Sequence, residues 1–450
     1  MSSSVPEPDA RAAMASATQR LAASDDGEDI DVQLVRPPSE PTGSLLGATA
    51  LVAGTTVGAG ILALPAKTLE AGFLPTAVAL FVCWCYMAAS GLLIAEVNIN
   101  TMCALGRNAV SIKSMAVGTL GVAGSRVASV TYVFIHCCLL VAYMLQGGAL
   151  LVEFLPDGTL PDAAGAPLFA GLGGGSLLFA SSKTVDRVNS VLVAGVVGTF
   201  GALLALGAPQ VNPELLLRAD VPAVLPAIPV LVLALVFHNV IPTISYQLGC
   251  DMHRVRTAIL LGSALPAAMF CAWDAVILGS LPPDSAAAAA AAAAAGQTFD
   301  PLTALRDLGG RFGDTVRAFS LLAIITSFIG FCYGLYDFYA DALGVDAAGS
   351  DAPFRQRLGL YSLVLLPPLA VALSDPTLFF TLLDTAGTYG ILVLFGIVPA
   401  AMAWVQRYGP NADPDIEPAL PGGRPVLAAM AAVAAMVVAG ETWERLSGLG

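Results

Sequence analysis

Residues 54–65 read Gly-Thr-Thr-Val-Gly-Ala-Gly-Ile-Leu-Ala-Leu-Pro and lie inside the first long apolar stretch of the chain. Inside a helix, glycine costs about 1 kcal/mol and proline about 3 kcal/mol relative to alanine, so this stretch predicts a broken helix. In a bilayer, the backbone groups released by a break must border protein or a watery cavity. Secondary transporters expose backbone donors and acceptors to a solute in this way. The stretch therefore favours a carrier of a small polar solute.

The composition indicates an all-α polytopic membrane protein. Of the 450 residues, 56% are hydrophobic and only 12% are charged, against about 25% charged in a typical soluble domain. The mean hydropathy is +0.77, and apolar runs of 18 or more residues recur, which is the signature of membrane-spanning helices. The formal net charge of −13 argues against nucleic acid as a partner, because nucleic-acid-binding proteins carry basic patches.

The hydropathy pattern predicts eleven membrane spans. With the N-terminus on the cytoplasmic side (or its organellar equivalent), most of the twenty Lys and Arg residues fall inside, as the positive-inside rule requires. The expected spans are Ser44–Phe73, Leu74–Asn100, Val127–Phe154, Ala166–Ser182, Val185–Leu206, Ala223–Ser245, Thr257–Leu281, Thr315–Leu343, Leu358–Leu373, Thr377–Trp404 and Pro425–Gly440.

Outside the membrane domain at 43–443, we expect only short segments. Residues 1–42 are rich in Ser, Pro, Asp and Glu, which predicts a disordered tail. This tail is a candidate partial organelle-targeting segment, although its acidic residues are atypical of transit peptides. Residues 282–300 contain ten consecutive alanines and predict a low-complexity outer loop, and residues 444–450 form a short C-terminal tail.

A second break is predicted in span six, where Phe-His-Asn-Val-Ile-Pro occupies residues 237–242. Pro242 lacks the backbone N–H that would continue a helix. Breaks in spans one and six are what an inverted five-plus-five repeat produces, with substrate bound where the two discontinuous helices meet. Span eleven is then an additional C-terminal helix.

The first break predicts an amino acid site. Amides around Gly58, Ala59 and Gly60 can bind a carboxylate, because they lie at the positive end of the following half-helix. Freed carbonyls of both breaks can receive an ammonium group, so a zwitterion fits. The alternative is close helix packing by the small residues Ala50, Gly54 and Gly58.

Side chains from several spans are candidates to complete this site. Thr56 beside the first break, Tyr143 in span three, Phe237 and Asn239 at the second break, and Tyr333 in span eight are expected to contact the substrate. For the aromatic residues, packing or anchoring at the interface is the alternative.

Ionisable residues inside membrane spans are expensive and suggest function. Glu96 in span two is a candidate for proton transfer, gating or a structural role, and His238 for a substrate or proton role or a hydrogen-bonded structural one. Asp274 in span seven can pair with a proton or with a hydroxyl of a neighbouring helix. Asp337 in span eight is a candidate gate at the inner mouth, whereas His136 is interpreted as a helix contact.

The sequence does not indicate an enzyme. The eight cysteines show no zinc-type spacing or secreted disulfide pattern. No metal cluster, nucleophile elbow or pair of catalytic carboxylates stands out, so no metal or cofactor is predicted. The phosphate-binding motif Gly-x-x-x-x-Gly-Lys-Ser/Thr is absent, which argues against an ATP-driven pump.

Five motifs together resemble the aromatic amino acid permeases, the tryptophan/tyrosine-specific carriers of the amino acid–polyamine–organocation superfamily. The motifs occur in family order, cover nearly all of Gly43–Trp443, and lie at Val52–Pro65, Ser90–Glu96, Val236–Pro242, Ser327–Asp341 and Leu366–Pro368. The residue sequence of span one and the Asn-Val pair after His238 are more similar to the plant and algal branch. Bacterial members commonly have Gly at the position of Asn239, which leaves the exact substrate preference open.

This resemblance implies a leucine-transporter-like inverted-repeat fold and proton-coupled uptake of tyrosine or tryptophan across a lipid bilayer. It also implies a chloroplast envelope or other organellar membrane, with the plasma membrane as the alternative. Sodium coupling stays open, with hydroxyls of Thr55, Thr56 and Ser327 as candidate ligands. A carrier for another neutral amino acid and a non-transporting amino acid sensor of the same fold are the alternative functions.

Overall fold

A computed structural model describes residues 43–58, 60–106, 110–154, 156, 160–282, 285–295, 298–307, 309–343, 353–410, 412 and 414–447. The predicted N-terminal tail and Ala59 therefore lie outside the described residues. Within these ranges the regular secondary structure is helical, without strands, as an all-α membrane protein requires.

The first span is broken as predicted. Helix α2 (Leu45–Thr56) and helix α3 (Gly60–Thr68) meet at an angle of 53°. The chain enters α2 at Ser44, whose hydroxyl accepts a hydrogen bond from the Gly47 N–H at 3.0 Å, the usual chemistry of a helix N-cap.

Nine described helices are long and apolar enough to cross a membrane, and the bent α2–α3 pair raises this number to ten. Most are single helices: α4 (Phe73–Leu105), α5 (Ile112–Glu153), α7 (Ser182–Gly207), α11 (Met252–Gly279), α14 (Gly310–Ala342), α15 (Phe354–Ser374) and α18 (Gly423–Ser447). The predicted fourth span corresponds to α6 (Gly165–Phe179), whose 15 residues are fewer than the roughly 17–25 that a span needs.

Two further spans are built from several pieces. The sixth comprises η3 (Pro222–Ala227), α9 (Ile228–Ala234), η4 (His238–Val240) and α10 (Ile241–Gln247), so the predicted second break is present. The tenth comprises α16 (Phe379–Thr385), the π-helix η6 (Ala386–Ile397) and α17 (Val398–Tyr408). π-Helical turns are rare and are frequently found at functional sites.

The connections differ from the sequence prediction in three places. The alanine run expected as a loop forms helix α12 (Ser285–Ala294), because alanine has the highest helix propensity. Helix α5 begins 15 residues before the expected third span. It is kinked at Gly121, whose φ of 70° is not helical. Helix α18 continues to Ser447, so part of the predicted C-terminal tail is helical.

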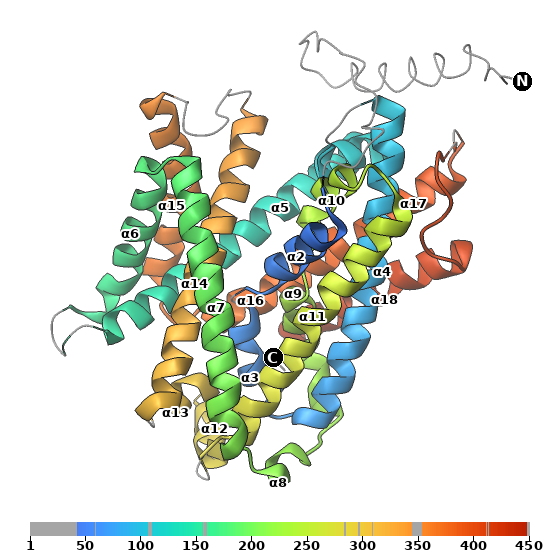
Figure 1. The fold of residues 1–450 in the computed structure, drawn as a ribbon. Coiled ribbons are helices and arrows are strands. Elements are labelled where there is room, and N and C mark those ends of the chain that lie inside the picture. The colour runs from blue at the N-terminus through green and yellow to red at the C-terminus, as the bar shows by residue number, and fades with distance from the viewer. Residues whose placement is uncertain are drawn as a thin grey trace, which may run out of the picture.

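The helices form two groups joined by the tilted α5 (Figure 1). Helices α6, α7, α14 and α15 make one group, and α2, α4, α10, α11 and α17 make the other; α5 packs against α6, α14 and α15 and also against η6 and α17. The short helices α8 (Pro213–Leu216), α12 and α13 (Pro301–Asp307) lie together at the lower end. All three follow spans predicted to end on the outer side.

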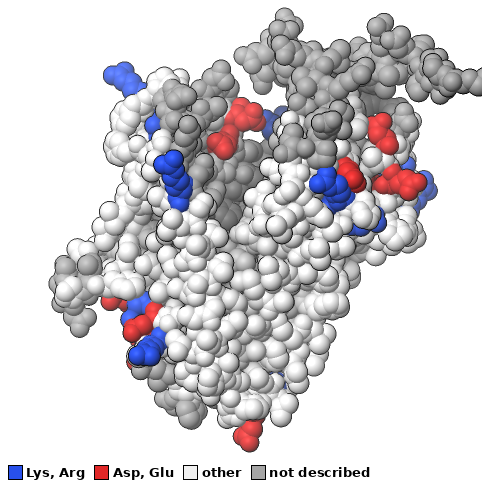
Figure 2. Space-filling model, in the orientation of Figure 1, with Lys and Arg blue, Asp and Glu red and all other residues white. Residues whose placement is uncertain are grey.

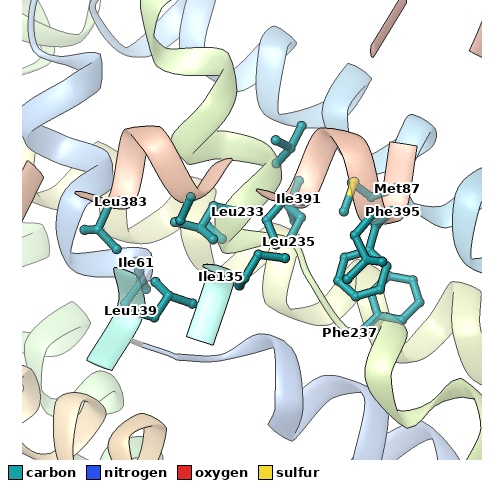
Figure 3. Close-up of a cluster of buried hydrophobic side chains, with 14 of the residues drawn as sticks. Ile61, Met87, Ile135, Leu139, Leu233, Leu235, Phe237, Leu383, Ile391 and Phe395 are labelled. Carbon is teal, nitrogen blue, oxygen red and sulfur yellow. The ribbon is translucent and has the colours of Figure 1, made fainter. Parts of the chain in front are cut away.

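Surface and core match a membrane environment. Figure 2 shows that the charged side chains of this face gather towards its two ends, with a broad uncharged band between them. Apolar side chains exposed on the helices include Phe81, Val191, Leu265 and Met436. Inside, Figure 3 shows Ile61 of α3 beside Leu139 of α5 in a cluster of buried apolar side chains.

A buried ion pair fastens the segment between α17 and α18. Arg407 donates from Nε and Nη2 to the two carboxylate oxygens of Glu96, both at 2.6 Å, and the side chains are only 4% and 1% exposed. Glu96 also accepts the Ala419 N–H at 2.6 Å, while Arg256 donates to the Ala419 carbonyl at 2.7 Å. The Glu96 carboxylate thus joins α4 to α17 and to the segment that follows α17, and Arg256 of α11 holds the same segment through the Ala419 carbonyl.

We expect Glu96→Gln to destabilise the protein strongly. The variant leaves the buried Arg407 guanidinium without its counter-charge, and breaking a buried pair in this way costs roughly 3–5 kcal/mol. Thermal unfolding in detergent should show a clearly lower melting temperature. Arg317→Gln is the matched control, because its pair with Glu153 is partly exposed and exposed pairs contribute about 0–1 kcal/mol. Equal shifts for both variants would contradict the structural role of Glu96.

Candidate functional site

The two broken spans meet at their breaks. A Cβ atom added to Gly60, the first residue of α3, would lie 3.0 Å from the Cα atom of Ala234, the last residue of α9. Leu235 and Phe237 then depart from helical backbone angles, with Phe237 at φ −137° and ψ 3°. A side chain larger than hydrogen at Gly60 would push the two breaks apart.

The first break also contacts α14 of the opposite helix group. A Cβ atom added to Gly58 would lie 2.9 Å from the hydroxyl oxygen of Ser327. Nearby, Thr55 and Thr56 donate their hydroxyls to the carbonyls of Leu51 and Val52 at 2.7 and 2.8 Å. These two hydroxyls are therefore engaged within α2, while Gly58 brings backbone close to Ser327.

Backbone groups at this break have complementary polarity. The last four carbonyls of a helix and the first four N–H groups of the next have no partner within their own helix. Helix α2 ends at Thr56, where Val57 is extended, and α3 begins at Gly60, with the Ile61 N–H directed to the Gly58 carbonyl at 3.3 Å. The negative end of one helix and the positive end of the next thus face one small region.

Three side chains of α5 and α14 gather beside Gly58. The hydroxyl of Tyr143 forms a hydrogen bond with Ser327, and the rings of Tyr143 and Phe331 lie 5.7 Å apart, edge to face. Ser327 and Phe331 are one helical turn apart and so share a face of α14. Of the predicted aromatic residues, Tyr143 is the one placed at the first break.

Phe237 and His238 lie at the second break but point into the protein core. A Cβ added to Gly91 of α4 would lie 2.8 Å from the Phe237 ring. The His238 ring is stacked between Phe237 and Phe395, with centroid distances of 4.6 and 4.7 Å. Figure 3 shows Phe237 and Phe395 together with Met87 at one end of the apolar cluster. Both rings thus shape the break through packing.

The remaining predicted residues are spread over the molecule. Asn239 is exposed within the second break. Tyr333 forms a hydrogen bond with Tyr361 of α15. Asp337 is exposed near the C-terminal end of α14, a location suited to the mouth of the protein.

Glu96 and Asp274 occupy opposite ends of the membrane domain. Glu96 is held by Arg407, as described above. Asp274, 2% exposed, accepts a hydrogen bond from the Thr68 hydroxyl of α3 at 2.9 Å. The hydroxyl of a neighbouring helix, one of the two partners expected for Asp274, is therefore present.

Sequence reasoning missed Phe331, Phe395 and Arg407 as partners of these groups. Phe331 could have been found from its four-residue spacing to Ser327, a candidate sodium ligand in the sequence. Phe395 and Arg407 are more than 150 residues from His238 and Glu96, and the apolar or basic pattern around them gives no pairing information. Only tertiary contacts reveal these partners.

Two interrupted spans that meet at their breaks, within a polytopic helical protein, are typical of membrane transport proteins. Residues 41–440 match the model of the tryptophan/tyrosine permease family. The chain therefore belongs to that family, which consists of transporters and not of enzymes.

The chain is similar to several bacterial transporters over most of its length. It is 31% identical to the tyrosine-specific transport system 2 and 29% identical to the tyrosine-specific transport system 1 of Haemophilus influenzae; the matches cover 80% of this chain and 87% and 88% of those proteins. It is 27% identical to the tryptophan-specific transport protein of Pseudomonas aeruginosa, over 81% of this chain and 87% of that protein.

We expect Gly58→Val to abolish amino acid uptake without preventing membrane insertion, because its side chain would fill the gap to Ser327. A loss of at least about tenfold in transport rate, equivalent to roughly 1.4 kcal/mol, is expected in reconstituted vesicles. Gly54→Val is the matched control: a Cβ at Gly54 meets nothing within 4 Å. Full transport by Gly58→Val would show that this break only packs helices.

Proposed function

We propose that this protein is a secondary transporter that moves tyrosine or tryptophan across a membrane by alternating access. The observation that carries the proposal is the meeting of two interrupted spans at Gly60 and Ala234. Family membership and the tyrosine- and tryptophan-specific relatives support aromatic amino acids as the substrate class.

The first break suits both charged groups of an amino acid. The substrate carboxylate would bind the free amides at the start of α3, where the helix dipole favours negative charge. Its ammonium group would bind carbonyls at the end of α2, where the dipole favours positive charge. One small region thereby recognises a zwitterion without a charged side chain.

An aromatic substrate side chain would lie beside Phe331 and Tyr143. Their rings are 5.7 Å apart, and aromatic rings favour edge-to-face and offset-stacked neighbours. The Tyr143–Ser327 hydrogen bond fixes the position of the phenol ring next to Gly58. Exposed Asn239 and the backbone of the second break would line the opposite side.

Alternating access would follow from movement of one helix group relative to the other. Gly58 follows α2 and Ser327 lies in α14, two helices of different groups (Figure 1), so substrate bound between these residues would contact both groups. In many transporters, one bundle rocks against the other around such a fixed site. A five-plus-five inverted repeat, as the two breaks suggest, would relate the inward-open and outward-open states.

The proposed coupling ion is the proton, with sodium as the alternative. The hydroxyls of Thr55 and Thr56 donate their hydrogens to carbonyls within α2, which leaves their oxygen lone pairs available, so both stay candidate sodium ligands. The ionisable side chains inside the spans supply candidates for proton binding. For the host membrane we propose an organellar envelope such as that of the chloroplast, with the plasma membrane as the alternative.

Reconstituted protein should accumulate labelled tyrosine or tryptophan when the outside is made acidic. One coupled proton supports about tenfold accumulation per pH unit, because one pH unit corresponds to about 1.4 kcal/mol. A protonophore should abolish the accumulation, and replacing sodium with choline should leave it unchanged.

Competition by unlabelled amino acids defines the substrate class. Tryptophan, tyrosine and phenylalanine should inhibit uptake more strongly than leucine or glutamine. Stronger inhibition by leucine or glutamine would identify a carrier for other neutral amino acids, and specific binding without any uptake or exchange would identify a sensor.

A further inference from the structure

We propose that Asp274 binds the coupling proton and that its hydrogen bond with Thr68 transmits the protonation state to α3. This inference rests on the proposed function of a proton-coupled carrier. It assigns the proton to one of the ionisable residues inside the spans and names the contact through which proton binding influences the substrate site.

Asp274 is a buried carboxyl group that is only half satisfied. Its side chain is 2% exposed, and Oδ1 accepts a hydrogen bond from the Thr68 hydroxyl at 2.9 Å. The buried Oδ2 atom has no hydrogen-bond partner among the described residues. An ionised carboxylate without a counter-charge is costly in such surroundings, whereas a neutral carboxyl group can exist there.

Thr68 gives this pair two alternative hydrogen-bond arrangements. Its hydroxyl lies 2.8 Å from the Leu64 carbonyl as well as 2.9 Å from Asp274, but it has one hydrogen to donate. With Asp274 ionised, the hydroxyl donates to the carboxylate. With Asp274 protonated, the carboxyl O–H donates to the Thr68 oxygen and the hydroxyl donates to Leu64. Binding of one proton to the carboxylate, giving a neutral carboxyl group, thus reverses one hydrogen bond.

Several charged groups on the elements around α11 are paired with other residues. In the described part of the chain, no Lys, Arg or His lies within 4.0 Å of the Asp274 carboxylate. Among the titratable residues on the elements packed against α11, three are paired: Lys67 of α3 with Asp384, Glu96 of α4 with Arg407, and Arg306 of α13 with Glu153 and Asp300. The others are Cys83, Cys85, Tyr86 and Cys103 of α4, Lys183, Asp186 and Arg187 in the first turns of α7, Glu214 of α8, Tyr246 of α10 and Asp307 of α13. Cys271, one turn away on α11 itself, is the titratable neighbour that interacts with Asp274.

Helix α3 connects this carboxyl group to the substrate site. Gly60 begins the helix at the break, and Thr68 ends it. Eight residue steps of 1.5 Å place these ends about 12 Å apart. The helix is short and stiff, so a change at Thr68 alters the position or freedom of the amides at Gly60. By thermodynamic linkage, a proton at Asp274 and a substrate at the break then change each other's affinity by the same factor.

The decisive experiment compares accumulation with exchange in vesicles containing the full-length protein. Asp274→Asn keeps the size and the acceptor for Thr68 but cannot take up a proton. With an inward gradient of one pH unit, the wild type should accumulate labelled tyrosine or tryptophan about tenfold. The variant should reach an accumulation ratio of about one, while exchanging internal for external substrate at a rate within about twofold of the wild type.

Thr68→Val provides a second test if Asp274→Asn is inactive in both assays. The variant removes the donor to the ionised carboxylate, and hydrogen bonds to a charged form stabilise it. The pH at half-maximal uptake should therefore move upward, whereas a merely structural effect would lower the rate at every pH. Asp375→Asn, a half-buried acid just after the end of α15, is the control and should retain the wild-type pH profile.

Each result decides the proposal. The role of Asp274 is overturned if Asp274→Asn accumulates substrate along the pH gradient as the wild type does. If Asp274→Asn loses both accumulation and exchange, an unshifted pH profile for Thr68→Val overturns it. The failure of the proposed function is distinguishable, because it would appear as absent accumulation and absent exchange in the wild type itself.

Discussion

The structure depends on one constraint: backbone polar groups inside a bilayer need partners, and two of its spans are nevertheless interrupted. Gly60 allows the first break to approach Ala234 of the second, and Gly58 allows the same break to approach Ser327. The protein thereby surrounds the released N–H and carbonyl groups with its own atoms. Interruption is tolerated in lipid because these groups face protein or a watery site rather than acyl chains.

Some contacts around the breaks stabilise the fold, whereas others lie between the two helix groups. Phe237, His238 and Phe395 form a stack that fixes the shape of the second break. At the other extreme, Glu96 and Arg407 join the segment before α18 to α4, which makes this part of the molecule a firm unit. At the first break, Gly58, which follows α2, lies against Ser327 of α14 in the other helix group. The proposed substrate site therefore lies where the two helix groups meet.

Buried acids in this protein have different partners and hence different chemistry. Glu96 is paired with a guanidinium group, so its charge is compensated and it serves the fold. Asp274 has a neutral hydroxyl as its partner, so its charge is uncompensated when it is ionised. Burial alone does not distinguish a structural carboxylate from a proton-binding one; the charge of the partner does.

The sequence by itself determined the class of protein, most of the span positions, both breaks and the family, because apolar length, glycine and proline act locally along the chain. It could not determine which side chains meet: His238 stacks on Phe395, Tyr333 turns to Tyr361, and Glu96 pairs with Arg407 across 311 positions. The alanine run, predicted as a loop, forms a helix because alanine has a high helix propensity. Only the tertiary structure decided the pairing of polar groups, because burial and partner choice arise from how helices pack and not from local pattern.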